Sequence, residues 1–182
     1  SLGLMTGFGN PMLRLVGAKV ALDGMLRSGT AALREPYVGK NGDRGLLTID
    51  VDVLQEKVSA CQKAGLRVCI HAEGDRGIDT ALDAVEKAKE EYPRFQIRHR
   101  IEHFGLCHLD QIRRMKQLGV IPSSSLNFIQ DIGEGYQKVL GSDRSEWLYP
   151  MKSLAEEGIV GSCNSDWPVS VGNPMIGLFS AV

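Results

Sequence analysis

Continuous apolar stretches alternate along this chain with stretches whose apolar residues recur every three or four positions. The clearest continuous runs are Leu15–Leu22 (LVGAKVAL), Leu66–Ile70 (LRVCI) and Ile159–Cys163 (IVGSC). Short runs of this kind predict buried strands. Phe95–Ile101 predicts another strand, although charged residues interrupt it, and Val120–Ile121 opens a short one.

The intervening segments have helical spacing. We predict that Asp50 caps a helix with the apolar stripe Val51, Leu54, Val58 and Cys61, and that Asp75 caps the next helix. Further helices are predicted near residues 109–118, where Gly119 ends the pattern, and at Trp147–Glu157. The Gly-rich, polar stretch Asn127–Ser145 predicts an active-site loop with a helical turn.

Strands that alternate with helices predict an α/β fold with a parallel sheet. The chain has 182 residues and about five such strands, whereas a closed (β/α)8 TIM barrel typically needs ~250 residues. Three arrangements remain open: a partial barrel, an open sheet, or two copies that complete each other. We take residues 1–182 as a single fragment of one domain.

Composition narrows the function classes. The chain is 43% hydrophobic and 24% charged with a net charge of −1, which is typical of soluble globular proteins. Its basic residues are scattered, so we expect no nucleic-acid partner, and no apolar run is long enough for a membrane span. No signal peptide is evident, and the four cysteines lack CxxC spacing. We therefore expect buried free thiols and a cytoplasmic protein.

Candidate metal ligands follow three of the predicted strands. LRVCI leads into His71, FQIRHRIE into His103 and IVGSCNS into Asp166. The carboxyl ends of parallel strands share one crevice, where ligands bind. Two imidazoles and a carboxylate suit a divalent metal such as zinc, and the carboxylate could also take a proton from a bound water.

Each of these residues also has a purely structural interpretation. A histidine at a strand end can hydrogen-bond a neighbouring loop, and Asp166 precedes Trp-Pro and could form a turn. The coincidence of all three at strand ends favours the metal site.

Lys19 lies inside the apolar run LVGAKVAL. An unpaired ammonium is costly to bury, so this lysine must reach solvent, pair with Asp23, or be carboxylated to bridge two metals. Composition does not distinguish these states.

Several blocks of the sequence resemble a known family. HAEGDRGIDTALDAVE, RHRIEH, SDWPVSVGNP and AKVALDGMLRSGTAALREPY resemble blocks of the amidohydrolase superfamily, close to its YtcJ-like subgroup, and they stand in the family's order. The resemblance runs from about Ala18 to Pro174. It implies about strands 4–8 of a (β/α)8 barrel with one or two metal ions at its top.

The resemblance also implies roles for individual residues. Lys19 would be the strand-four lysine, His71 and His103 the ligands of strands five and six, and Asp166 the strand-eight aspartate that ligates metal and activates water. The implied reaction is hydrolysis of a carbon–nitrogen, amide-like bond in a small molecule.

Two departures from the family pattern limit what this chain could do alone. It contains no HxH pair, which the family carries on strand one, and Ser123–Phe128 stands where relatives tend to carry Gln-Pro. We therefore expect the fragment to bind metal weakly and to be inactive.

Two other functions fit the same sequence. One is a barrel lyase or isomerase that uses Lys19 as a Schiff base or general base. The other is a non-catalytic half-barrel that assembles, for example as a homodimer, through its open edges.

Overall fold

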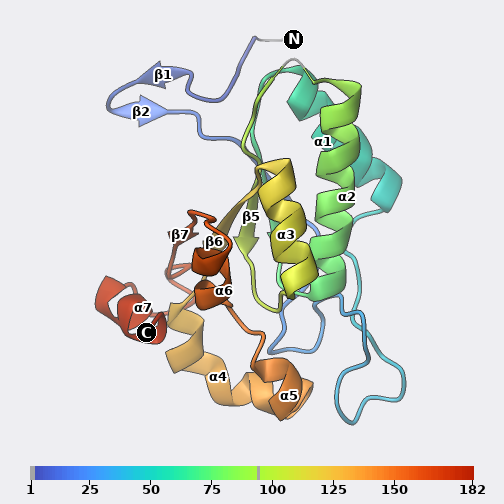
Figure 1. Cartoon of the computed structure of the whole chain (residues 1–182), viewed down its shortest axis with the longest axis vertical. Coiled ribbons are helices and arrows are strands. Elements are labelled where there is room, and N and C mark those ends of the chain that lie inside the picture. The colour runs from blue at the N-terminus through green and yellow to red at the C-terminus, as the bar shows by residue number, and fades with distance from the viewer. Residues whose placement is uncertain (1–2, 94) are drawn as a thin grey trace.

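A parallel sheet of five strands forms the centre of this computed structural model, which describes residues 3–93 and 95–182 (Figure 1). The strands lie in chain order, β3-β4-β5-β6-β7, with every neighbouring pair parallel. Their bounds are β3 Ala18–Ala21, β4 Val68–Ala72, β5 Arg100–His103, β6 Ile121–Ser124 and β7 Ser162–Cys163. The predicted α/β class is confirmed, and the sheet is consistent with part of a (β/α)8 barrel.

The two faces of this sheet have different environments. Val20, Ile70 and Ile101 point to one face and pack into the apolar core. Because side chains alternate along a strand, Lys19 and His71 lie on the other face. That second face would be the interior of a closed barrel.

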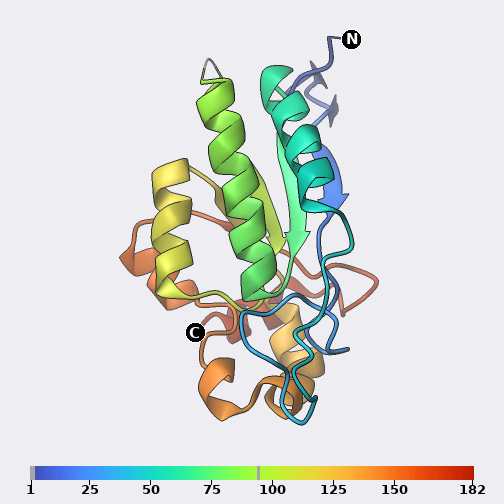
Figure 2. The same ribbon diagram turned by 90° about the vertical axis from the view of Figure 1, so that its right-hand side faces the viewer.

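Three helices cover the first face, side by side in front of the strands (Figure 2). They are α1 Val51–Lys63, α2 Asp75–Glu91 and α3 Leu109–Leu118. The Asp50 carboxylate accepts hydrogen bonds from the backbone N–H groups of residues 52 and 53, so the predicted cap of α1 is confirmed. Gly119 ends α3 in the left-handed conformation with φ 62°, also as predicted.

The prediction that Asp75 caps α2 was wrong. Gly74 is the N-cap and Asp75 is the first helical residue. The Asp75 carboxylate instead accepts the backbone N–H of Arg34 at 2.8 Å and lies 3.3 Å from His108 Nε2. It therefore ties the loop before α1 and the start of α3 to the start of α2.

The prediction of a loop at residues 127–145 was also wrong, because most of this segment is helical. Helix α4 spans Asn127–Leu140 and α5 spans Ser142–Ser145. Phe128, Tyr136 and Leu140 lie on one face of α4 and are buried. Burial of this stripe outweighs the low helix propensity of the glycines within the segment.

The predicted strand Phe95–Ile101 begins later than its apolar pattern suggested, at Arg100. At this point the buried ring of His99, rather than a backbone carbonyl, bonds to the start of β4. Its Nδ1 accepts the backbone N–H of Val68 at 3.1 Å. His99 Nε2 lies 2.9 Å from Gln62 Oε1, which ties the loop to α1.

The remaining elements lie at the two ends of the sheet. Helix α6 covers Met151–Glu156 and α7 covers Pro174–Ser180, both near the end of the sheet to which the strands point, and a two-stranded hairpin of β1 Gly9–Asn10 and β2 Leu13–Arg14 projects at the other end (Figure 1). All four cysteines are free thiols. Cys69 and Cys107 are buried as expected, whereas Cys61 is only partly buried and Cys163 is exposed. Within the described residues, no helix has both the length and the apolar character needed to cross a membrane.

Candidate metal centre

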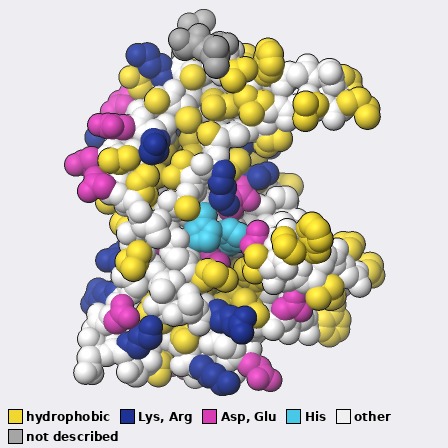
Figure 3. Space-filling view, turned by 180° about the vertical axis from the view of Figure 1, so that it is seen from behind, with side chains coloured by type: hydrophobic (Ala, Val, Ile, Leu, Met, Phe, Trp, Pro, Cys, Tyr) yellow, Lys and Arg dark blue, Asp and Glu magenta, His cyan; other side chains and the backbone are white. Residues whose placement is uncertain are grey.

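Parallel pairing brings the ends of β3, β4 and β5 to one edge of the sheet. Ala21 pairs with His71, and Ala72 pairs with His103. The imidazole rings of His71 and His103 meet edge to face, with centroids 4.4 Å apart and an interplanar angle of 64°. Seen from behind, histidine side chains reach the surface in the middle of the molecule, with basic and acidic side chains beside them (Figure 3).

The backbone at the end of β5 makes this contact possible. Strict alternation would place His103 on the helix-covered face with Ile101. However, His103 has φ 68° and the next residue, Phe104, has φ 52°. Asp166 likewise has φ 52°. A left-handed backbone at non-glycine residues costs about 1–3 kcal/mol each and is concentrated at functional sites, so two of the predicted site residues stand in strained positions.

The carboxylate of Asp23 lies next to the ring of His71. The sequence pattern did not identify Asp23 as a site residue. Its buried carboxylate accepts the backbone N–H groups of Ala32 (3.1 Å), Glu73 (3.1 Å) and Gly74 (2.9 Å). It also lies 3.4 Å from His71 Nε2. The missed signal was positional, since Asp23 follows the first strand much as Asp166 follows the last.

The hydrogen bonds of His71 define its tautomer. Nε2 lies 2.9 Å from the carbonyl oxygen of Gly24, which can only accept. Nε2 therefore carries the proton and Nδ1 is free in the neutral ring. Burial lowers the pKa of His71, but the contacts with Asp23 and Gly24 outweigh burial and the net shift is upward.

His103 has the opposite electrostatic environment. Burial, with the nearby positive charges of His71 and Lys19, lowers the pKa of His103 to about 3. Its ring is therefore neutral at physiological pH, the state that can donate a lone pair to a metal.

Lys19 is exposed on the face without helices. Partial desolvation of its amine lowers its pKa, which the carboxylates of Glu102 and Asp166 partly offset. The alternative of a salt bridge between Lys19 and Asp23 was wrong, because the Asp23 carboxylate is occupied by His71 and three backbone N–H groups. Lys19 thus reaches solvent, and whether it is carboxylated stays a prediction.

Asp166 lies at a turn after β7. Its backbone carbonyl accepts the N–H of Val169 at 2.7 Å, so the turn-forming interpretation is correct as far as the backbone goes. The Asp166 side chain is half-buried and close enough to Lys19 to influence its pKa. The turn and a role for the carboxylate are compatible.

Glu73 is a second acidic group that the sequence did not single out. It is 1% exposed, and its Oε2 accepts the backbone N–H of Leu26 at 2.8 Å. Burial raises the pKa of Glu73 to about 7, against the opposing effects of this hydrogen bond and of His71. The site therefore holds a carboxyl group that can exchange a proton near neutral pH.

The donor set fits a divalent metal in part. Two neighbouring imidazoles, one with Nδ1 free, are good ligands for zinc and related ions. Among the described residues, however, no group of three or more His, Cys, Asp or Glu side chains surrounds one metal position. His71 and His103 are brought together as predicted, whereas Lys19 and Asp166 lie nearby without completing a set.

Polar residues also follow β6 and β7. Ser125 Oγ lies 3.0 Å from His103 Nδ1 and 2.9 Å from Asn164 Oδ1. Both residues stand at strand ends in the sequence, but neither serine nor asparagine is a typical zinc ligand, so the metal-ligand pattern did not select them.

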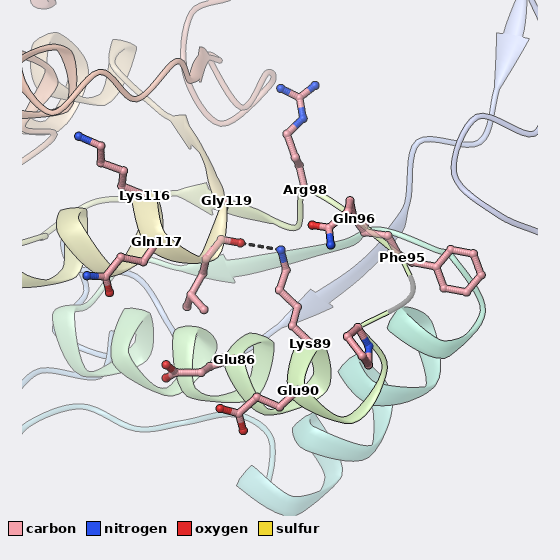
Figure 4. Close-up of a pocket in the computed structure, with 12 residues that line it drawn as sticks. Glu86, Lys89, Glu90, Phe95, Gln96, Arg98, Lys116, Gln117 and Gly119 are labelled. Carbon is pink, nitrogen blue, oxygen red and sulfur yellow. Dashed lines mark hydrogen bonds between the residues drawn. The ribbon is translucent and has the colours of Figure 1, made fainter.

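A cavity of about 660 Å³ lies at the opposite end of the sheet, where α2 and α3 end (Figure 4). There Lys89 Nζ donates a 2.6 Å hydrogen bond to the carbonyl of Leu118, which satisfies a free carbonyl at the end of α3. The cavity is remote from the strand ends that carry the histidines, and we assign it no part in the candidate site.

Several known proteins are similar to this chain. The sequence matches the amidohydrolase family over residues 1–182. It is 33% identical over 171 residues to Protein LONG AFTER FAR-RED 3 of Arabidopsis thaliana, covering 93% of this chain and 29% of that protein. It is 28% identical over 173 residues to the putative amidohydrolase YtcJ of Bacillus subtilis, and the match covers 94% of this chain and 32% of that protein. It is 27% identical over 121 residues to N-substituted formamide deformylase of Arthrobacter pascens, and the match covers 66% of this chain and 22% of that protein.

A solved structure is similar over the whole chain. It is an uncharacterized metal-dependent hydrolase from Pyrococcus furiosus, with a TM-score of 0.84 and 33% identity, and the match covers 100% of this chain and 36% of that one. The chain thus spans about a third of the length of these similar proteins.

Proposed function

Because the chain belongs to the amidohydrolase family, we propose that it forms the C-terminal part of a barrel that hydrolyses non-peptide carbon–nitrogen bonds with a divalent metal. The parent protein would act on a small molecule with an amide-like group. The names of two relatives, a putative amidohydrolase and an N-substituted formamide deformylase, support this bond class.

The observation that carries the proposal is the contact between His71 and His103 at the ends of β4 and β5. Their rings converge although strand alternation alone would separate them, and His103 is held neutral. The buried structural His99 is also held neutral, so the convergence of the two rings is the feature that distinguishes His71 and His103. In this proposal His71 and His103 hold the ion, and their imidazole donors suit zinc. Asp166 and a carboxylated Lys19 would be the further ligands, because an unmodified lysine ammonium has no lone pair to donate.

A bound divalent metal would supply Lewis-acid polarisation of the carbonyl and activation of water. The chain's own residues do the rest. The Asp166 carboxylate takes a proton from the attacking water and passes it to the leaving amine. The Gly24 carbonyl orients His71 by accepting the proton of Nε2, with the Asp23 carboxylate 3.4 Å from the same nitrogen, so that Nδ1 faces the opposite way.

The chain alone is expected to be inactive. It has no HxH pair, and its described residues do not complete a set of three ligands. Edge strands β3 and β7 each have one neighbour in the sheet, so the remaining barrel strands would dock there.

The test uses the full-length parent. Its hydrolysis of N-substituted formamides and other amides is measured before and after chelator treatment, and again after zinc is restored. We expect activity to fall with the chelator and return with metal. Asp166→Asn should lower kcat by at least about 100-fold, the lower end for loss of a general acid–base, whereas the exposed Asp83→Asn should not. Full activity in the metal-free enzyme would overturn the proposal.

A further inference from the structure

A hydrogen-bond relay runs from His103 to the ends of the last two strands. His103 Nδ1 lies 3.0 Å from Ser125 Oγ, which lies 2.9 Å from Asn164 Oδ1. Asn164 Nδ2 in turn lies 2.9 Å from the carbonyl oxygen of Ser123 and 3.0 Å from its hydroxyl. Backbone bonds fix the spacing, because Ser125 N–H donates to the His103 carbonyl and Asn164 N–H donates to the Ser124 carbonyl.

The direction of every bond in this relay follows from its last member. The Ser123 carbonyl can only accept, so the Asn164 amide must present its NH₂ group to it. Asn164 Oδ1 therefore faces Ser125. An amide oxygen also only accepts, so the single hydroxyl proton of Ser125 points to Asn164.

With its proton committed, Ser125 Oγ can only accept from His103. The proton of the neutral His103 ring therefore resides on Nδ1, and Nε2 carries the free lone pair. A flip of the ring would replace Nδ1 by a carbon atom and break the relay. The plane of the ring is further restricted by His71 and by Phe128, which is stacked at a centroid distance of 6.2 Å and an angle of 13°.

We propose that Ser125 and Asn164 are positioning residues that hold His103 in the Nδ1–H tautomer and so leave Nε2 free to bind the divalent cation. The claim that Nε2 binds a divalent cation rests on the proposed function. The assignment of the His103 tautomer does not, because it follows from the hydrogen bonds alone. His71 has the opposite arrangement, with Nε2 protonated toward Gly24 and Nδ1 free. The two rings thus present different nitrogens.

The chain contains a matched control for this relay. Ser124 is also buried and lies one residue before Ser125, but its hydroxyl makes no hydrogen bond within the described part of the chain. Ser124→Ala removes the same atom as Ser125→Ala, from the same strand end, and leaves the relay intact.

The direct test is long-range ¹H–¹⁵N correlation spectroscopy on the metal-free chain with labelled histidines. In the wild type we expect His103 Nδ1 to resonate as a protonated nitrogen and Nε2 as an unprotonated one. Ser125→Ala and Asn164→Ala should each produce a mixture of the two tautomers, and Ser124→Ala should not. A wild-type His103 with its proton on Nε2, or a tautomer unaffected by both relay variants, would overturn the inference.

The second readout is zinc affinity of the full-length parent. Loss of a hydrogen-bond partner behind a metal ligand typically weakens binding about 10- to 100-fold, and we expect a loss in this range for Ser125→Ala but none for Ser124→Ala. If the tautomer changes as expected while zinc affinity is unaltered, the relay stands and the proposed role of His103 as a ligand is wrong.

Discussion

The imidazole rings of His71 and His103 lie 4.4 Å apart at the ends of adjacent parallel strands, although only His71 lies on the barrel-interior face by strand alternation. The left-handed backbone at His103 brings the second ring across. Such a position costs free energy and must be held by the surrounding packing. The surrounding structure therefore stabilises this contact, and substitution of the residues that pack against the two rings should lower the stability of the fold.

Asp23 is the most sensitive of these supports. Asp23→Ala would leave the backbone N–H groups of Ala32, Glu73 and Gly74 without their buried acceptor. An unsatisfied buried donor costs about 1–3 kcal/mol, so we expect the free energy of unfolding to fall by about 3 kcal/mol in urea denaturation. Asp83→Ala removes an exposed carboxylate that pairs with Arg114, and should cost below about 1 kcal/mol. Equal losses in the two variants would contradict this role.

His99 should make stability depend on pH. Burial lowers the pKa of His99 to about 4, with smaller contributions from Lys89 and Arg67, whereas an unfolded histidine has a pKa near 6.5. As pH falls from 6.5 to 4, the unfolded chain binds a proton that the folded chain excludes. Stability that is fully present above pH 6.5 is then lost, by up to about 3 kcal/mol at pH 4.

The measurement is urea denaturation at several pH values for the wild type and His99→Asn. Other groups also titrate in this range, so the difference between the two proteins isolates His99. That difference should shrink as pH falls from 6.5 to 4. A difference independent of pH would show that His99 is not held neutral by the fold.

Two glycines should respond to alanine with opposite signs. Gly119 ends α3 with φ 62°, where a side chain is strained, so Gly119→Ala should cost about 1 kcal/mol. Gly133 lies inside α4, and a Cβ atom added there would meet no other atom within 4 Å. Gly133→Ala should therefore stabilise the chain by about 0.5–1 kcal/mol. Thermal unfolding of both variants checks this, and destabilisation by Gly133→Ala would argue against a helix at this position.

The sheet and its helices follow from local patterns, which explains why they could be predicted. Asp50 and Gly119 mark the ends of α1 and α3 by short-range hydrogen bonds and backbone geometry that depend on adjacent residues alone. Helix α4 could not be predicted from its glycine-rich pattern, because burial of Phe128 and Tyr136 against distant residues decides its structure.

The candidate site shows the same division. Strand-end position was enough to select His71, His103 and Asp166, but it did not show the turn of the backbone at His103. Asp23 and Ser125 occupy equivalent strand-end positions and act through hydrogen bonds to partners far along the chain. Tertiary contacts of this kind are invisible to periodicity and spacing.

The most direct test of the central claim is the metal content of the proposed full-length protein and its histidine variants. His71→Ala and His103→Ala should each lose most of the bound divalent metal in elemental analysis. His108→Ala removes a histidine that lies 3.3 Å from Asp75 at the start of α3, outside the candidate centre, and should keep the wild-type content. Full metal content in both His71→Ala and His103→Ala would contradict the account.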